Sequence, residues 1–161
     1  MTFSLRDIIR EDINLLAEVY AEAFKPERTG EHWTLENSKA LMEYCFDRSS
    51  KDLRILVVNE KGKIIGAFFA DVKPWWDGSR IVNAEFFIEP DYQKLGAGRM
   101  LFKEILQRAK ANHNAINFET ITFMPDTEHP LKWYLKLGFQ KETDWVIING
   151  NIDLILNELQ D

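Results

Sequence analysis

The chain has 161 residues, of which 45% are hydrophobic and 29% charged, and this is the size and balance of one globular domain. That composition excludes a collagen, a coiled coil and a disordered chain. The 26 acidic residues outnumber the 20 basic ones, the net charge is −6, and no basic run offsets it, so we expect no nucleic acid as a partner.

The first fifty residues predict one strand followed by two helices. A short strand is expected over 2–8, and apolar residues at helical spacing predict a helix over 13–24. Residues 26–30 are expected to form a loop because they begin with Pro and end with Gly. Thr34 is the expected N-cap of the second helix. One face of that helix carries Leu41, Tyr44 and Cys45.

The middle of the chain changes from a helical to an extended pattern. Residues 53–58 and 64–72 predict two strands of a hairpin, joined by a turn at Lys61 and Gly62. A second turn is expected at 75–78, where the sequence is Trp-Trp-Asp-Gly. It leads into a third, central strand over 81–88.

The last part of the chain returns to mixed elements. We expect an amphipathic helix over 97–109, a strand over 116–123, and a short helix that begins near Pro130 and ends at Gly138. A hairpin is expected over 145–156 because Asn-Gly favours a tight type I′ turn. This order predicts an α/β fold in one domain over 1–161, with a mixed, mostly antiparallel twisted sheet flanked by helices.

Several features bear on compartment and metal binding. Cys45 is the only cysteine and cannot form an intrachain disulfide, which favours a reducing compartment. The longest strongly apolar segment, 64–70, is far shorter than the roughly 18 residues of a membrane span. The three histidines show no metal-ligand spacing. We therefore expect a soluble cytoplasmic protein with no membrane contact and no metal.

The segment 85–101 carries the most informative pattern, because a buried strand runs into a glycine turn that opens a helix. Free amides at a helix N-terminus, with the helix dipole behind them, bind phosphate, and glycine lets the backbone approach it. Lys94 and Arg99 add positive charge. A Rossmann loop is excluded by Leu101 in place of a third small residue. A P-loop is excluded because Arg99 and Met100 follow the last glycine.

Two motifs together resemble the GNAT N-acetyltransferase superfamily. Residues 93–98, Gln-Lys-Leu-Gly-Ala-Gly, are similar to that family's Gln/Arg-x-x-Gly-x-Gly/Ala loop. Residues 133–139, Trp-Tyr-Leu-Lys-Leu-Gly-Phe, resemble its second marker, a helix bearing Tyr and ending in Gly-Phe. The segment 129–138 is also similar to the matching helix of some aminoglycoside acetyltransferases.

The resemblance implies a splayed central strand pair, with acetyl-CoA in the gap as co-substrate. The strand before the loop would pair with the pantetheine arm, the loop amides would hold the pyrophosphate, and Tyr134 would lie near the thioester sulfur. The residues expected to bind the cofactor are Phe86, Phe87, Ile88, Gln93, Lys94, Leu95, Gly96, Ala97, Gly98 and Arg99.

The reaction implied is direct attack of an amine on the acetyl group in a ternary complex, which needs a base for the ammonium form. Glu85, beside the cofactor gap, is the first candidate and Glu119, on the next strand, is the second. Some relatives carry a glutamate where this chain has Thr122, so the identity of the base stays open between these residues and water.

The acceptor is expected to be a small molecule with a primary amine, because the chain is acidic and shows no peptide-docking feature. A protein N-terminus or lysine, a longer acyl donor, and a non-catalytic CoA-binding module are the alternatives. The segment 27–33, with Glu27, Glu31 and Trp33, lies where the family's variable acceptor loops fall. Trp75 and Trp76 could pack on the sheet edge, line the acceptor site or form a homodimer contact. His129 is expected to cap the short helix, and the alternative is that it lines the acceptor pocket.

Overall fold

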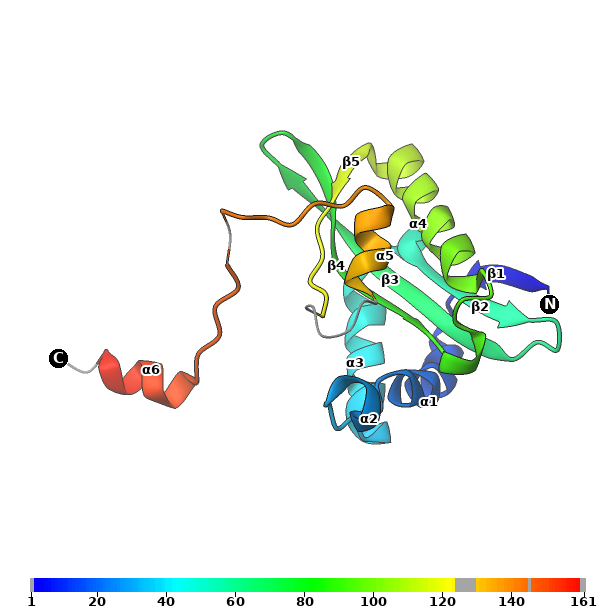
Figure 1. Cartoon of the computed structure of the whole chain (residues 1–161), viewed down its shortest axis with the longest axis horizontal. Helices are drawn as coiled ribbons and strands as arrows, with labels where there is room; N and C mark the ends of the chain where they lie inside the picture. Colours follow the sequence, from blue (N-terminus) through cyan, green and yellow to red (C-terminus); the bar gives the residue numbers. More distant parts are fainter. Residues whose placement is uncertain (1, 124–129, 145, 160–161) are drawn as a thin grey trace. The chain divides into compact units, whose positions relative to one another are not determined.

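The computed structural model describes residues 2–123, 130–144 and 146–159. By their contacts the residues fall into two compact units, Met1–Thr120 and Ile121–Asp161, and each is described by itself (Figure 1). The expectation of one domain over 1–161 stays a prediction.

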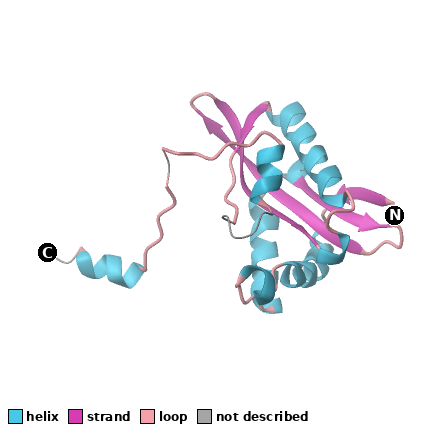
Figure 2. Cartoon of the chain, viewed as in Figure 1, coloured by secondary structure: helices cyan, strands magenta, loops and turns pink. Residues whose placement is uncertain are grey.

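The first unit is built on a five-stranded sheet in which the strands follow one another in chain order (Figure 2). Neighbouring strands are antiparallel, except that the last two are parallel. The predicted mixed, mostly antiparallel sheet is therefore confirmed. The strands are β1 (Phe3–Asp7), β2 (Arg54–Asn59), β3 (Ile64–Trp75), β4 (Gly78–Ile88) and β5 (Ala115–Phe118).

Helices cover both faces of this sheet, as Figure 1 shows. Helices α1 (Ile13–Ala23) and α3 (Leu35–Arg48) pack on one face, where they bury a core with Leu56, Phe69 and Phe87. Helix α4 (Ala97–His113) lies on the other, where its Phe102 ring packs against strand aromatics. Each large apolar side chain buried in this way contributes roughly 1.5–3 kcal/mol. Those strand aromatics are Phe68, Phe86 and Phe118.

The segment before α3 departs from prediction in one place. Residues 26–30 form the short helix α2 (Pro26–Thr29) rather than a loop, with Pro26 in its first turn and Gly30 at φ +76° ending it. The Thr34 N-cap is confirmed, since its hydroxyl accepts a hydrogen bond from the Asn37 amide at 3.1 Å. Tyr44, expected on the same face as Cys45, is exposed instead.

The last two strands of the sheet, β4 and β5, pair over only part of their length. Strand β5 was expected over 116–123 but ends at Phe118, and its ladder with β4 reaches only to Ile81. Strand β4 continues to Ile88. Strands β4 and β5 are thus paired over a short stretch, as a splayed pair would be.

The second unit contains two short helices, α5 (Leu131–Lys136) and α6 (Ile152–Glu158). The predicted hairpin over 145–156 is wrong, because Ile152 onward is helical and 146–150 form no strand; Trp145 lies outside the described residues. The Asn151 side chain accepts hydrogen bonds from the backbone amides of Asp153 and Leu154. This N-cap stabilises the helix relative to the predicted hairpin turn.

Among the described residues, no helix is long and apolar enough to cross a bilayer. The expected cytoplasmic location stays a prediction.

Candidate active site

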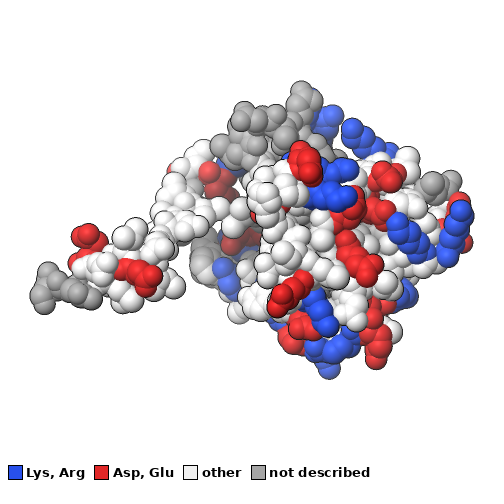
Figure 3. Space-filling model, turned by 90° about the horizontal axis from the view of Figure 1, so that it is seen from below, with Lys and Arg blue, Asp and Glu red and all other residues white. Residues whose placement is uncertain are grey.

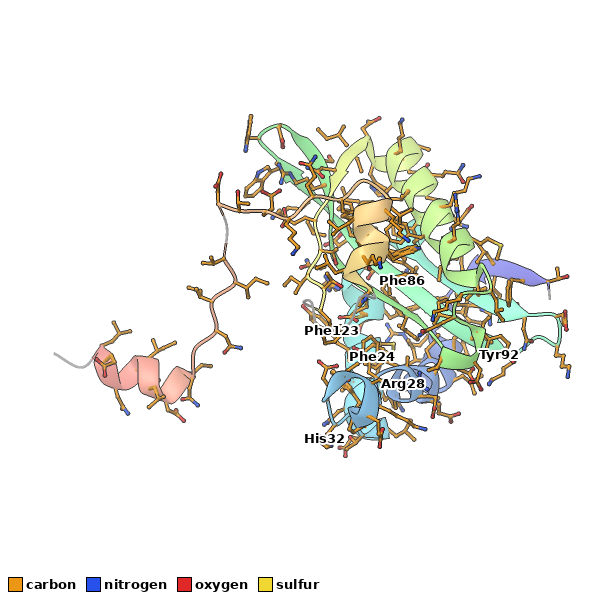
Figure 4. All side chains as sticks on the ribbon, in the orientation of Figure 1. Phe24, Arg28, His32, Phe86, Tyr92 and Phe123 are labelled. Carbon is orange, nitrogen blue, oxygen red and sulfur yellow. The ribbon has the colours of Figure 1, made fainter. Side chains whose placement is uncertain are left out.

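The end of β4 and the turn after it are held by side chains of the chain itself. Figure 4 labels Phe86 on β4 and Tyr92 in the turn that leads to α4. The Tyr92 hydroxyl accepts a hydrogen bond from the side-chain amide of Asn59 at 3.1 Å. The side-chain amide of Gln93 donates to the backbone carbonyl of Ile88 at 3.0 Å. Gln93, the first residue of the loop motif, therefore closes the turn onto the strand end.

The glycine turn that follows ends in the N-terminus of α4. Lys94 and Gly96 both adopt positive φ, +62° and +96°, and Gly96 is the N-cap. The first amide that donates within the helix is that of Met100, to the Gly96 carbonyl. Within the described part of the chain, the amides of Leu95 to Arg99 have no acceptor. These amides lie at the positive end of a seventeen-residue helix.

The two glycines of the loop have different roles. A Cβ at Gly96 would meet nothing within 4 Å, so this glycine is required by its backbone angle and leaves open space beside the turn. A Cβ at Gly98 would lie 3.2 Å from Cζ of Phe86, so this glycine lets α4 pack against β4. Lys94, Leu95 and Arg99 are exposed, whereas Ala97 is buried.

The three strand residues predicted to bind the cofactor point to opposite faces. Phe86 stacks on Phe68 at 5.1 Å on the α4 face, and Phe87 contacts the ring of Tyr20 at 5.1 Å on the α1 face. Phe87 and Ile88 are buried. Close approach of β3 to this strand end depends on Gly66, where a Cβ would lie 2.4 Å from the Phe87 carbonyl oxygen.

A bulge in β4 sets the direction of Glu85. The register with β3 shifts between Phe69 and Asp71, and Asn83 takes φ +52°, held by a 2.6 Å hydrogen bond from Arg48 to its carbonyl. Bulges of this kind re-aim the side chains next to them. Glu85 pairs with Phe69 and lies on the α1 and α3 face.

Glu85 is half-buried beside the ring of Tyr20, whose hydroxyl donates to Oε2 at 3.4 Å. Burial raises the pKa of Glu85, and the negative charge of Glu31 acts in the same direction. The Tyr20 hydrogen bond and the positive charge of Arg48 oppose this rise without cancelling it. A carboxyl with a raised pKa in a partly enclosed site is suited to accept a proton near neutral pH.

Glu119 occupies a different environment. It follows β5, its side chain is 53% exposed, and it forms ion pairs with Arg80 at 3.3 Å and Lys73 at 3.9 Å. The structure therefore brings Glu85, and not Glu119, against the aromatic side chains of the α1 face.

The segment 27–33 contributes to the Glu85 side of the sheet. Trp33 packs edge-on against Tyr20 at 5.1 Å, and its indole Nε1 donates to Glu31 at 3.0 Å. Glu27 is exposed on α2. Figure 4 also labels Arg28, on α2, and His32, which follows it. Sequence reasoning missed Tyr20, because its helical spacing is also that of an ordinary core residue.

In the second unit, Tyr134 belongs to the C-terminal cap of α5. The Phe139 amide donates to the Tyr134 carbonyl at 3.2 Å and the Gly138 amide to the Leu135 carbonyl at 3.1 Å, which is a Schellman motif with Gly138 at φ +99°. The Tyr134 ring contacts Phe139 at 5.2 Å. The sequence Tyr-Leu-Lys-Leu-Gly-Phe is thus a helix end that fixes its own tyrosine.

The other site residues considered from the sequence have less structural support. Trp76 is 87% exposed at the β3–β4 turn, and Lys73 lies over the Trp75 ring at 4.2 Å. His129 lies outside the described residues. No cluster of three metal-ligating side chains occurs within 2–123, 130–144 and 146–159. On the face seen in Figure 3, acidic and basic side chains are interspersed.

Comparison with known proteins identifies the family. A family model described as an acetyltransferase (GNAT) domain matches residues 51–141, more than half of the chain. The chain therefore belongs to the GNAT acetyltransferase family. The matched region contains Glu85, the glycine turn and Tyr134. A comparison with curated proteins finds no significant match.

Solved structures share the fold at low sequence identity. An integron cassette protein from the mobile metagenome of Vibrio cholerae has a TM-score of 0.76 at 13% identity, covering 100% of this chain and 99% of that one. A possible acetyltransferase from Clostridium difficile 630 has a TM-score of 0.71 at 11% identity, covering 94% and 99%. An aminoglycoside acetyltransferase from an uncultured soil metagenomic sample has a TM-score of 0.65 at 18% identity, covering 94% and 100%.

Proposed function

We propose that this chain transfers an acetyl group from acetyl-CoA to the primary amine of a small molecule, by direct attack in a ternary complex. The observation that carries the proposal is the open glycine turn, where the amides of 95–99 face no acceptor within the described residues. Amides at a helix N-terminus bind phosphate, and acetyl-CoA carries a pyrophosphate. Lys94 and Arg99, both exposed beside the turn, add positive charge.

The strand end beside the turn supports the same cofactor. Strand β4 runs on through Phe86, Phe87 and Ile88 after β5 has ended, so β5 does not pair with this part of the strand. The space beside Gly96 would admit a phosphate next to the backbone. We assign the pantetheine arm to the β4 residues and the pyrophosphate to 93–99.

The chemistry requires a neutral amine. An alkyl ammonium of pKa near 10.4 costs about 4.6 kcal/mol to deprotonate at pH 7. We assign this proton to Glu85, whose pKa is raised by burial. The amine nitrogen then bonds to the acetyl carbon while the carbon–sulfur bond breaks, and the second proton lost from nitrogen reaches the CoA thiolate through solvent. Full proton transfer from a tyrosine to the thiolate is uphill by about 2 kcal/mol, so we assign to Tyr134 a hydrogen bond to the departing sulfur.

A small amine is the acceptor that the Glu85 surroundings favour. Glu85 and Glu31 place two carboxylates near the rings of Tyr20 and Trp33, and such a site attracts a cation with an apolar body. The net charge of −6 also favours a positively charged acceptor.

The deciding experiment is release of free CoA thiol from acetyl-CoA with a panel of amines. The panel holds diamines, amino sugars, amino acids and a peptide with a free N-terminus and a lysine. Cys45 adds little background, because burial raises the pKa of its thiol to about 11. We expect thiol release with at least one small amine. Binding of acetyl-CoA without release for any amine would favour a non-catalytic module, and release with the peptide alone a protein acetyltransferase.

Glu85→Gln tests the assignment of the base. We expect turnover to fall by about 10²- to 10⁴-fold at neutral pH and the acid limb of the pH–rate profile to change, since a general base contributes this much. Glu119→Gln is the matched control and should leave the profile as in the wild type. An unchanged profile for Glu85→Gln would transfer the role to Glu119 or to water.

A further inference from the structure

Tyr20 is buried in α1, and its ring is fixed from three sides. The rings of Phe24, Trp33 and Phe87 lie 4.5, 5.1 and 5.1 Å from it, the last two edge-on. These neighbours come from the C-cap of α1, from the segment before α3 and from β4. With 3% of its surface exposed, the ring has little freedom to reorient.

The hydroxyl of this fixed ring has one partner within the described residues, Oε2 of Glu85 at 3.4 Å. Burial raises the pKa of Tyr20 far above its usual value, and the negative charge of Glu85 raises it further. The hydroxyl therefore keeps its proton at neutral pH and acts as a donor toward the carboxylate.

The other titratable groups around Glu85 affect its carboxylate through charge rather than through a directed hydrogen bond. The NH2 group of Arg48, on α3, donates a hydrogen bond to the Asn83 carbonyl at 2.6 Å, and the positive charge of Arg48 attracts the Glu85 carboxylate. Glu31, before α3, repels it. Cys45, also on α3, has a pKa of about 11, raised by burial and by the Glu85 charge, and it remains a neutral thiol.

We propose that Tyr20 is a positioning residue for acetyl transfer: its hydroxyl holds the Glu85 carboxylate in one orientation toward the acceptor amine. This inference rests on the proposed function, in which Glu85 is the base. A glutamate side chain has three rotatable bonds and loses rotamer freedom when it is ordered. A rigid donor orders it before the amine binds. At 3.4 Å the contact is longer than the usual 2.5–2.7 Å of a hydroxyl bonded to a carboxylate, so it has room to shorten.

Tyr20→Phe removes the donor and keeps the ring contacts. We expect kcat/KM at neutral pH to fall about tenfold, the loss of roughly one hydrogen bond to a charged group. The acid limb of the pH–rate profile should move to higher pH, because the hydrogen bond stabilises the charged form of Glu85 and its removal raises the pKa. At alkaline pH, where Glu85 is ionised in both proteins, the loss should become smaller, and the part that remains is the effect of the lost orientation.

Two controls separate positioning from packing. Tyr44→Phe removes a hydroxyl from an exposed tyrosine of α3 and should change neither rate nor profile. In a Glu85→Gln background, Tyr20→Phe should add no further loss, because its effect passes through Glu85. A loss that is the same at every pH, or one that persists without Glu85, would overturn the inference.

A titration of the ligand-free protein tests the contact independently of turnover. The Glu85 carboxyl is followed by ¹³C NMR and identified by its absence in Glu85→Gln. We expect its pKa to rise in Tyr20→Phe and to be unchanged in Tyr44→Phe. An unshifted titration would show that Tyr20 does not act on Glu85. If the titration shifts while the wild type releases no thiol with any amine, the contact stands and the proposed function, with the positioning role, falls.

Discussion

Tyr134 is held in place by the end of its own helix. Its carbonyl accepts the hydrogen bond from Phe139 and its ring packs on that residue, so the cap fixes both the backbone and the ring of Tyr134. The family motif therefore has a structural meaning of its own, since only glycine at 138 readily takes φ +99°.

Tyr134→Phe keeps the cap and removes the hydroxyl. We expect turnover to fall by about 100-fold, as for loss of one donor to a developing charge, with little change in acetyl-CoA affinity. Steady-state kinetics with calorimetric binding of acetyl-CoA would separate the two effects. Unaltered turnover would remove the assigned role from Tyr134.

At the residue scale the sequence pointed to Glu85 but could not choose between it and Glu119. The choice depends on which face of β4 the side chain occupies, and the bulge at Asn83 changes that alternation. Tyr20 gave no signal of its own, because a tyrosine at helical spacing has the same pattern whether its hydroxyl meets solvent or a carboxylate.

At the scale of elements, the strand–turn–helix unit from β4 to α4 was predictable because its signals are local. A run of β-formers, Pro90, two glycines and an amphipathic pattern follow one another within 81–109. The prediction of a hairpin over 145–156 failed because a hairpin depends on pairing between two strands and not on local signals alone. A hairpin needs two strands to pair, whereas Asn151 caps a helix with atoms only two and three residues away.

The glycine turn can be tested as an element with Gly96→Val. The new side chain meets open space and a strained φ of +96°, so we expect a stability loss of about 1–2 kcal/mol and at least a tenfold weaker binding of acetyl-CoA. Gly62→Val is the control, because Gly62, at φ +77° in the β2–β3 turn, also faces open space. It should cost similar stability and leave binding unchanged. Equal affinities for both folded variants would contradict the pyrophosphate site.

For the molecule as a whole, acid stability depends on a carboxylate that joins β1 to α1. Both oxygens of Asp12 accept hydrogen bonds from Arg6 at 2.7 Å, and the Ile9 amide donates to it at 2.9 Å. Burial alone would raise the pKa of Asp12, but these bonds outweigh it and the pKa is lowered. The stabilisation is therefore complete above the unfolded pKa of about 3.9 and is lost as pH falls through the lower folded value.

Asp12→Asn should lower the free energy of unfolding by about 1–3 kcal/mol at pH 7, the usual cost for bonds to a charged group. Its stability should also fall less steeply than that of the wild type below pH 4. Urea unfolding at several pH values measures both. Asp47→Asn, which changes an exposed side chain, should have little effect, and an equal loss in both variants would contradict the role of Asp12.

Local sequence patterns were enough to predict the order of elements in the first 120 residues apart from the short helix α2, the mixed sheet, the glycine turn and the resemblance to the family, because each depends on short-range spacing. Only the tertiary structure decided that Glu85 faces α1 and α3, that Tyr20 donates to it, and that β5 leaves β4 at Ile81. These facts join residues up to 65 positions apart, through strand register and a bulge, and no local pattern encodes such a distance.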